Sequence, residues 1–301
     1  MSDTPPAIEN ETGFDRVLAF TLPERDARGR SVRLGPTLDL ILSAHDYPVA
    51  ARNLLSEALV LCALMGSLVK TGGQLTMQAR ASEGAVSLLV CDYRGGELRG
   101  YVQHDKEALE QLGANPDLKA LFGNEAFLAI TFDLATGGRY QGVVPLDGAT
   151  LSVACEHYFR QSEQVPSVLR VAISSEGAHT VAGGVLIQHL PDGEEGRERL
   201  HVRYDDPDWE HVAVIGGSVR HAELVDPTLS MEAIVWRLFH EEDTVRVEAL
   251  DRIVRGCRCT VEHYRDVLSR FSPDDLAEMR EDDGLIHVDC AFCSKVFELD
   301  V

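Results

Sequence analysis

The longest stretch of helical periodicity runs from Val49 to Lys70. Its apolar positions recur at i, i+3 and i+4 spacing, and they are Leu54, Leu55, Ala58, Leu59, Cys62, Met65 and Leu68. This spacing predicts an amphipathic helix, and the two glycines after Thr71 predict its end. A second helix is predicted to begin at Thr150 and to end before Pro166. Its apolar face is formed by Leu151, Ala154, Cys155, Tyr158 and Phe159.

Alternating apolar and polar positions predict β-strands between and after these helices. The segments are QLTMQARA, AVSLLVCDY, ELRGYVQ, VLRVAISS and AGGVLIQHL. AFLAITFDL and RYQGVVPL flank ATGG, which predicts a β-hairpin. RGRSVRLGPTLDLILSAHDYP predicts a strand or turn that leads into a short helix. Helices and strands in this mixed order predict an α+β fold rather than a doubly wound sheet.

The pattern changes at Pro191, where acids, prolines and glycines replace apolar periodicity. This composition is typical of a linker. Two helical pieces are predicted after it, and the second carries an apolar stripe that needs a partner surface, formed by Ile234, Val235, Leu238 and Phe239. We therefore expect a disordered tail at 1–13, a mixed α/β core domain at 14–190, a partly helical linker at 191–250 and a small C-terminal domain at 251–301.

Acidic residues outnumber basic ones 49 to 28, which gives a formal charge of -21. This charge argues against nucleic acid and anionic membranes as partners, because phosphate binding depends on Lys and Arg. No apolar run reaches the ~18 residues of a bilayer span. The polar start MSDTPPAIENETGFDR lacks the features of a signal peptide. We therefore expect a cytoplasmic protein, in a reducing compartment where clustered cysteines more often bind metal or react with oxidants.

Four of the seven cysteines form two close pairs near the end of the chain, Cys257-x-Cys259 and Cys290-x2-Cys293. Each pair can supply two corners of a tetrahedral thiolate site, so the spacing predicts zinc bound by these four ligands. Two helices capped by Thr260 and Ser272 are predicted between the pairs, and two strands are predicted on either side of the CAFC turn. A unit of this size usually needs a metal or disulfides to fold alone. Structural zinc contributes about 10–16 kcal/mol in small peptides, so metal would decide whether the unit folds.

Other interpretations of the paired cysteines are inert thiols, a permanent structural zinc unit and a thioredoxin-like enzyme. The last is disfavoured because Cys290 and Cys293 lie near the C-terminus rather than after an early strand. Nearby positive charge favours the thiolate that oxidants attack, and so favours a redox-active site; the arginines are Arg252, Arg255, Arg258, Arg265 and Arg270. The three other cysteines are expected to be buried small hydrophobic residues: Cys62, Cys91 and Cys155.

The cysteine motif resembles the hallmark of the 33-kilodalton heat-shock protein family. Its members are redox-regulated bacterial holdase chaperones. In that family C-x-C is followed at a distance by C-x-x-C, as at Cys257, Cys259, Cys290 and Cys293. Segments of the core also resemble the family, namely LGPTLDLIL, LLSEALVLCALMGSLVKTGGQLTMQ, LRGY, YFRQSEQVP and AGGVLIQHLP.

The resemblance implies an α+β core, a flexible linker and a C-terminal zinc-binding redox switch. It implies that the reduced, zinc-bound form is inactive, and that oxidation joins Cys257 to Cys259 and Cys290 to Cys293 with release of zinc. The oxidised protein would then form a homodimer and hold unfolding client proteins without ATP, as a stress-response chaperone and not as an enzyme. A constitutive zinc-stabilised interaction module and a thiol-disulfide oxidoreductase remain open as alternatives.

Overall fold

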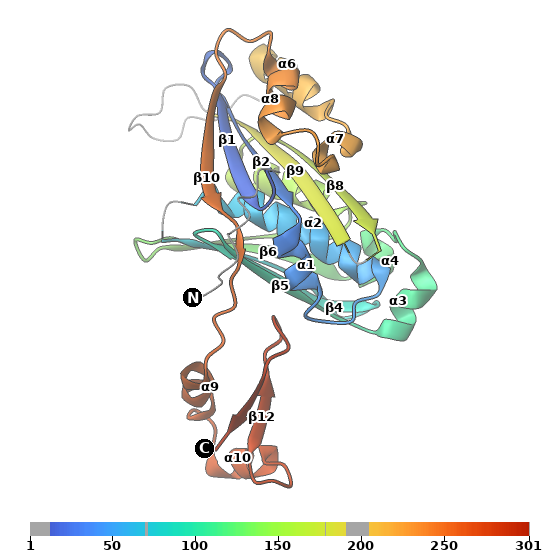
Figure 1. The fold of residues 1–301 in the computed structure, drawn as a ribbon, viewed down its shortest axis with the longest axis vertical. Helices are drawn as coiled ribbons and strands as arrows, with labels where there is room; N and C mark the ends of the chain where they lie inside the picture. Colours follow the sequence, from blue (N-terminus) through green and yellow to red (C-terminus); the bar gives the residue numbers. More distant parts are fainter. Residues whose placement is uncertain (1–12, 70–71, 178, 191–204, 301) are drawn as a thin grey trace, which may run out of the picture.

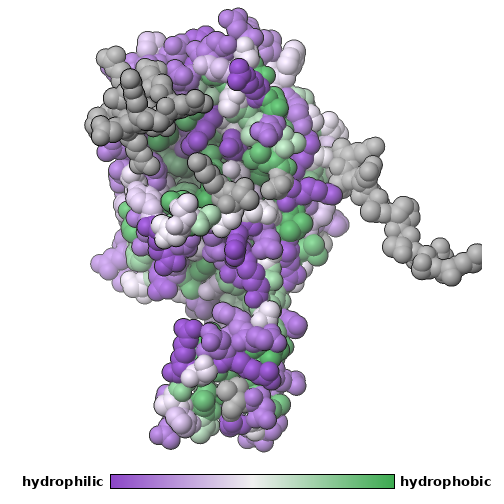
Figure 2. Space-filling view, turned by 90° about the vertical axis from the view of Figure 1, so that its left-hand side faces the viewer, coloured by the Kyte–Doolittle hydropathy of each residue, from purple (hydrophilic) through white to green (hydrophobic). Residues whose placement is uncertain are grey.

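The computed structural model describes residues 13–69, 72–177, 179–190 and 205–300. Two β-sheets with a long helix between them form the core, and a smaller C-terminal lobe extends from one end (Figures 1 and 2). Helices and strands alternate without a doubly wound sheet, so the α+β fold class that the sequence predicts is confirmed. Most of the expected tail, and the start of the expected linker at 191–204, lie outside the described residues.

The first sheet, sheet A, is antiparallel. Its strands in spatial order are β10 (Arg246–Arg252), β1 (Arg16–Leu22), β2 (Ala27–Leu34), β9 (His179–His189) and β8 (Ser167–Glu176). A short 3-10 helix, η1 (Pro23–Arg25), joins β1 to β2. Neither β1 nor β10 is predicted above: β1 is buried on both faces and lacks clear alternation, while β10 continues sheet A across the expected border at 250/251.

The second sheet, sheet B, packs on the opposite side of the long helix. Its strands in spatial order are β11 (Val254–Arg255), β5 (Glu97–His104), β4 (Val86–Arg94), β3 (Gln74–Ala81), β6 (Ala126–Asp133) and β7 (Arg139–Pro145). The short β11 runs parallel to β5, and the other neighbours are antiparallel. The predicted hairpin is β6–β7. Helices α3 (Lys106–Leu112) and α4 (Leu118–Phe122) follow β5.

Helix α2 (Val49–Gly66) is the predicted long helix, and it contacts strands of both sheets. Among the described residues it is the one helix long and apolar enough to cross a membrane, yet 78% of it is buried inside the protein, where it forms the centre of the core. Helix α1 (Pro36–Leu42) precedes it. Helix α5 (Leu151–Tyr158) packs beside it and continues into a π-helical turn, η2 (Phe159–Glu163).

Three helices of the expected linker cover the outer face of sheet A (Figure 1): α6 (Pro207–Gly217), α7 (His221–Val225) and α8 (Met231–Phe239). The apolar stripe on α8 is buried there, and the ring of Phe239 lies 5.8 Å from that of Phe20 on β1. The prediction of two helical pieces in this segment is wrong, because a third helix, the five-residue α7, forms between α6 and α8. Pro227 then separates α7 from α8, since proline interrupts a helix.

The C-terminal lobe contains two helices and a hairpin: α9 (Val261–Leu268), α10 (Pro273–Met279), β12 (Ile286–Asp289) and β13 (Val296–Leu299). Thr260 caps α9 by accepting a hydrogen bond from the His263 backbone, and Ser272 with Asp275 forms a capping box on α10. The lobe's apolar centre is small, and its buried side chains are Leu268, Ile286, Cys290, Phe297 and Leu299.

Candidate metal centre

The four cysteines that are paired along the sequence lie together in space. All four sulfur atoms lie within 4.8 Å of one another. The Cys257 sulfur is 3.2 Å from that of Cys259 and 3.6 Å from that of Cys290, and the sulfurs of Cys259 and Cys293 are 3.5 Å apart. Sulfurs placed tetrahedrally at zinc-thiolate bonding distance would be about 3.8 Å apart. The cluster therefore fits one tetrahedral thiolate site.

A tight turn between β12 and β13 presents the second pair of thiols. The Cys290 carbonyl accepts hydrogen bonds from the backbone N–H groups of Cys293 (3.1 Å) and Ser294 (2.8 Å). Ser294 adopts a left-handed conformation, with φ of 56°, and the chain then returns into β13. The first pair lies between β11 and α9, so a strand end and a helix start position its two thiols.

The thiols differ in how readily they lose a proton. Burial raises the pKa of Cys257, and burial together with the neighbouring sulfurs raises that of Cys259. Burial acts in the same direction on Cys290, but hydrogen bonds from the Tyr264 hydroxyl, the Phe292 backbone and neighbouring thiols outweigh it and lower its pKa to about 7. Cys290 thus forms a thiolate most readily of these three, and the thiolate is the form that binds metal.

Two of the arginines near the first pair form ion pairs or hydrogen bonds away from the thiols. Arg258 extends to the core, where it donates to Glu97 (3.1 Å) and Gln74 (2.7 Å). Arg270 pairs with Asp266 on its own helix turn. The principal influences on the thiol pKa values are burial and hydrogen bonds from sulfur, hydroxyl and backbone groups. For Arg258 and Arg270, proximity to the cysteines along the sequence therefore does not mean contact with the thiols.

The remaining cysteines are buried in the core, as predicted. Cys62, Cys91 and Cys155 are all fully inaccessible to solvent. Burial raises the pKa of each thiol well above its ordinary value. They therefore pack as small apolar side chains and lack the thiolate character that reactive cysteines need.

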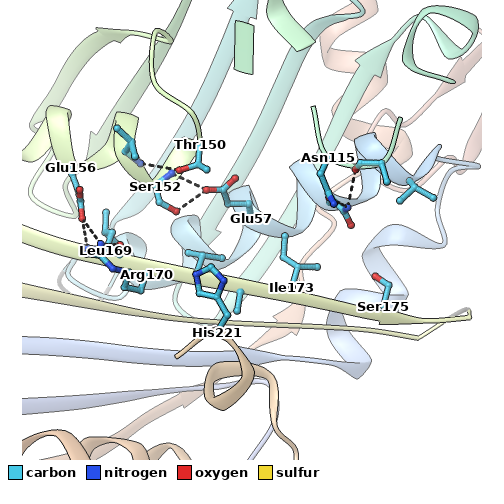
Figure 3. Close-up of a pocket in the computed structure, with 16 residues that line it drawn as sticks. Glu57, Asn115, Thr150, Ser152, Glu156, Leu169, Arg170, Ile173, Ser175 and His221 are labelled. Carbon is cyan, nitrogen blue, oxygen red and sulfur yellow. Dashed lines mark hydrogen bonds and ion pairs between the residues drawn. The ribbon is translucent and has the colours of Figure 1, made fainter. Parts of the chain in front are cut away.

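An open pocket of about 770 Å³ at the surface of the core domain is a feature that the sequence did not indicate. Figure 3 shows its polar groups in pairs: Ser152 beside Glu57, and Glu156 beside Arg170. Glu57 accepts hydrogen bonds from the Ser152 hydroxyl (2.7 Å) and backbone (2.9 Å), while burial raises its pKa. These groups satisfy one another without a ligand, so the cysteine cluster remains the candidate site.

Comparison with known proteins places these features in a family. A family model described as Hsp33 protein matches residues 15–300. The chain is 39% identical over 303 residues to the 33 kDa chaperonin of Caulobacter vibrioides, covering 97% of this chain and 98% of the relative. It is 31% identical over 290 residues to the 33 kDa chaperonin of Yersinia pestis, covering 96% and 93%.

A solved structure supports the fold. The crystal structure of the 33 kDa chaperonin (heat shock protein 33 homolog) from Thermotoga maritima matches with a TM-score of 0.75 at 20% sequence identity. The match covers 95% of this chain and 94% of that one, so it includes both the core and the C-terminal lobe. Together, the matched family, the full-length relatives and the shared fold mean that this chain is a chaperone of the Hsp33 family.

Proposed function

We propose that this chaperone is a redox-regulated holdase, which binds unfolding proteins without ATP after oxidation of Cys257, Cys259, Cys290 and Cys293. One observation carries the proposal: the cysteine cluster belongs to the small apolar centre of the C-terminal lobe. Cys290 is 2% exposed and lies within that centre, and the other three thiols pack against it. Chemistry at the sulfurs therefore acts directly on the packing that folds the lobe.

We propose zinc as the metal and the four thiolates as its ligands. When bound, zinc supplies binding free energy that becomes folding free energy of the lobe, because the unfolded segment offers no preformed site. A site closed by four thiolates has no open position for a substrate, which supports a structural rather than a catalytic role. The protein is then a binder of unfolded clients and not an enzyme.

Oxidation is proposed to join Cys257 to Cys259 and Cys290 to Cys293. For each disulfide, two thiolates lose two electrons and form an S–S bond. Hydrogen peroxide accepts these two electrons as its O–O bond breaks and, with two protons, leaves as two waters. A disulfide sulfur is no longer a thiolate ligand, so the oxidised lobe loses both its metal site and the metal-dependent part of its fold.

Release of the lobe would expose apolar surface through the chain that joins it to the core. We propose a division into a core at 14–190, a linker at 191–250 and a switch at 251–301, in which the linker helices leave sheet A. The face beneath them carries Leu18, Phe20, Val185 and Ile187, which form a contiguous apolar surface. Such a surface suits unfolded clients or a second oxidised copy. The charge of -21 would keep the opened protein dispersed in the cytoplasm.

The test is an aggregation assay on reduced and oxidised protein, with zinc and free thiols counted in the same samples. We expect the reduced protein to carry one zinc per chain and to leave client aggregation unchanged. Peroxide should remove four thiols and the zinc, and the oxidised protein should then suppress aggregation without ATP. Thiol reductant with zinc should restore the inactive form. In the Cys290→Ser variant, zinc binding should be weaker, whereas Cys155→Ala, which alters a buried core thiol, should retain one zinc.

Two outcomes would favour the alternatives. Equal suppression by the reduced and oxidised proteins would contradict the redox switch and favour a constitutive zinc-stabilised module. Catalytic turnover of a small disulfide would favour an oxidoreductase. Stoichiometric zinc in Cys290→Ser would contradict the ligand assignment.

A further inference from the structure

Both cysteine pairs face the same strand of the core. We define the first knuckle as residues 257–259 and the second knuckle as residues 290–293. Alternate residues of β5 share one face of sheet B, and three of them contact the knuckles: Glu97, Arg99 and Tyr101. Glu97 contacts the first knuckle, and the other two contact the second. One strand thus meets both halves of the candidate metal site.

The first knuckle is held by its middle residue, Arg258. Its side chain donates to Glu97 and Gln74, and the preceding Gly256 donates its backbone N–H to the carbonyl of Leu98 (2.9 Å). A Cβ at Gly256 would lie 2.4 Å from that of Glu97, so only glycine permits this approach. The chain is therefore pressed against β5 immediately before Cys257.

The second knuckle is held by Phe292, which lies between its two cysteines. The Phe292 ring meets the ring of Tyr101 edge-on, with centroids 4.9 Å apart, and the Arg99 guanidinium lies 4.0 Å above its centroid. Nearby, His45 Nε2 donates to the Ala291 carbonyl (2.8 Å), and the Ser294 hydroxyl donates to the Ala44 carbonyl (2.6 Å). Aromatic, cation–π and hydrogen-bond contacts therefore converge on this turn.

A line of hydrogen bonds across sheet B connects the two docking points. Gln74, which accepts from Arg258, donates to Thr76; Thr76 donates to Asp92 (2.8 Å); and Asp92 accepts two hydrogen bonds from Arg99 (2.8 and 2.6 Å). Thr76, Asp92 and Arg99 are directly opposite one another on β3, β4 and β5. Asp92 is 4% exposed, so the guanidinium that covers Phe292 is held rigidly in place.

We propose that Arg258 and Phe292 form a latch that docks the C-terminal lobe on β5, and that closing either knuckle disulfide withdraws the latch residue inside it. The core then senses oxidation through loss of docking, and not only through loss of metal. This inference rests on the proposed redox switch for its role, but the docking itself can be measured without it.

The position of the latch residues explains the coupling. Each lies between two cysteines, so its backbone becomes part of the ring that a disulfide closes. In the first knuckle the sulfurs are 3.2 Å apart and must approach to about 2.05 Å, which rotates the peptide units that aim Arg258. The ring contacts of Phe292 depend on centroid distance and interplanar angle, so a reoriented turn loses them.

The test compares full-length proteins in the reduced, zinc-loaded state. Phe292→Ala removes the latch from the lobe side, and Tyr101→Ala removes it from the core side without altering the lobe. Phe271→Ala, at an exposed phenylalanine of the same lobe, is the matched control. Arg258→Ala and Glu97→Gln form the equivalent pair for the first knuckle. Zinc content, backbone hydrogen exchange at residues 254–256 and suppression of client aggregation are measured for each.

We expect the four latch variants to keep one zinc while exchange at 254–256 rises about tenfold and partial chaperone activity appears without oxidant. Phe271→Ala should match the wild type. If residues 254–256 exchange at the wild-type rate in both Phe292→Ala and Tyr101→Ala, the latch is wrong. If Phe292→Ala loses zinc, the hydrogen exchange and chaperone activity of Tyr101→Ala decide instead. If oxidised wild-type protein fails to protect clients, the proposed function is wrong, yet the exchange data still decide whether the latch docks the lobe.

Discussion

Glu57 illustrates how a single residue in the core is adapted to an unfavourable place. Its carboxyl group lies on α2, facing the first turn of α5, and two hydrogen bonds from Ser152 satisfy it. An unpaired carboxylate there would carry a large desolvation cost. The two bonds tie α5 to α2, yet burial still raises the pKa of Glu57. Glu57 thus contributes most to the stability of the folded protein when it is protonated.

This residue predicts a pH dependence of stability. Because the pKa of Glu57 in the folded protein lies above its ordinary value of 4.5, the folded state binds this proton more tightly than the unfolded state. Its contribution to the free energy of unfolding is complete below pH 4.5, falls as the pH rises towards the raised pKa, and is constant above it. Glu57→Gln stays neutral, so its stability relative to wild type should increase across that window, by about 1.4 kcal/mol per unit between the two pKa values.

Denaturant unfolding of the core from about pH 4.5 to neutrality measures this difference. Glu125→Gln, at an exposed carboxyl group, provides the control for a simple loss of charge. Parallel stability curves for wild type and Glu57→Gln would contradict the assignment.

At the scale of elements, the helices of the proposed linker are held to sheet A by polar bonds as well as by the apolar stripe. Arg33 on β2 is 1% exposed and donates to the carbonyls of Leu224 (2.8 Å), Glu223 (3.0 Å) and Leu229 (2.6 Å). Gly183 on β9 leaves room for α7, because a Cβ there would lie 2.1 Å from the Leu224 oxygen. A helix as short as α7 has little stability of its own, so this arginine organises the linker.

Arg33→Lys therefore tests how the linker is attached. Lysine places one ammonium where the guanidinium reaches three carbonyls, and each buried carbonyl left without a donor costs about 1–3 kcal/mol. We expect faster hydrogen exchange in α7 and α8 of the reduced protein, with little change in α2. Arg30→Lys on the same strand is the matched control, since within the described part of the chain Arg30 donates a hydrogen bond only to the Gly29 carbonyl next to it. Protection of α7 equal to wild type would show that the apolar stripe alone holds the linker.

Across the whole molecule, one continuous segment connects the apolar stripe to the candidate metal centre. It passes from α8 into β10 on sheet A, then through Ile253 into β11 on sheet B and on to Cys257. Ile253 is 2% exposed, its N–H donates to the Asp15 carbonyl, and its own carbonyl accepts from Thr37. Both sheets and the lobe are thus linked by a single stretch of chain, which lets a change at the sulfurs reach the linker.

Hydrogen exchange resolved by segment tests this path. In reduced protein, Ile234, Val235, Leu238 and Phe239 are buried, and α8 should be strongly protected. After oxidation we expect protection to fall at β11, β10 and α8, while α2, which lies between the two sheets, stays protected. If α8 exchanges equally fast in the two redox states, oxidation of the cysteines does not control the linker.

Local patterns in the sequence were sufficient for several elements and for the four cysteines. Helix α2, the β6–β7 hairpin, the caps at Thr260 and Ser272, and the paired thiols all depend on residues close together in the chain, where periodicity, capping and metal-ligand spacing act. Strands β1 and β10 escaped prediction, because one is buried on both faces and the other lies in an acidic, linker-like region. The three-helix linker was also missed, since α7 depends on Arg33 and Gly183 far away in the sequence.

The sequence alone determined that four thiols could form a metal site in a small unit, because ligand type and spacing are local properties. Only the tertiary structure decided where that site lies and what it touches. Arg258 looked like a charge that activates its neighbouring cysteines, but it extends to Glu97, and Phe292 looked like a residue of a turn, but it packs on Tyr101. These partners lie in β5, more than 150 residues away in the chain. The fold brings them together through sheet pairing and burial, which spacing along a sequence does not encode.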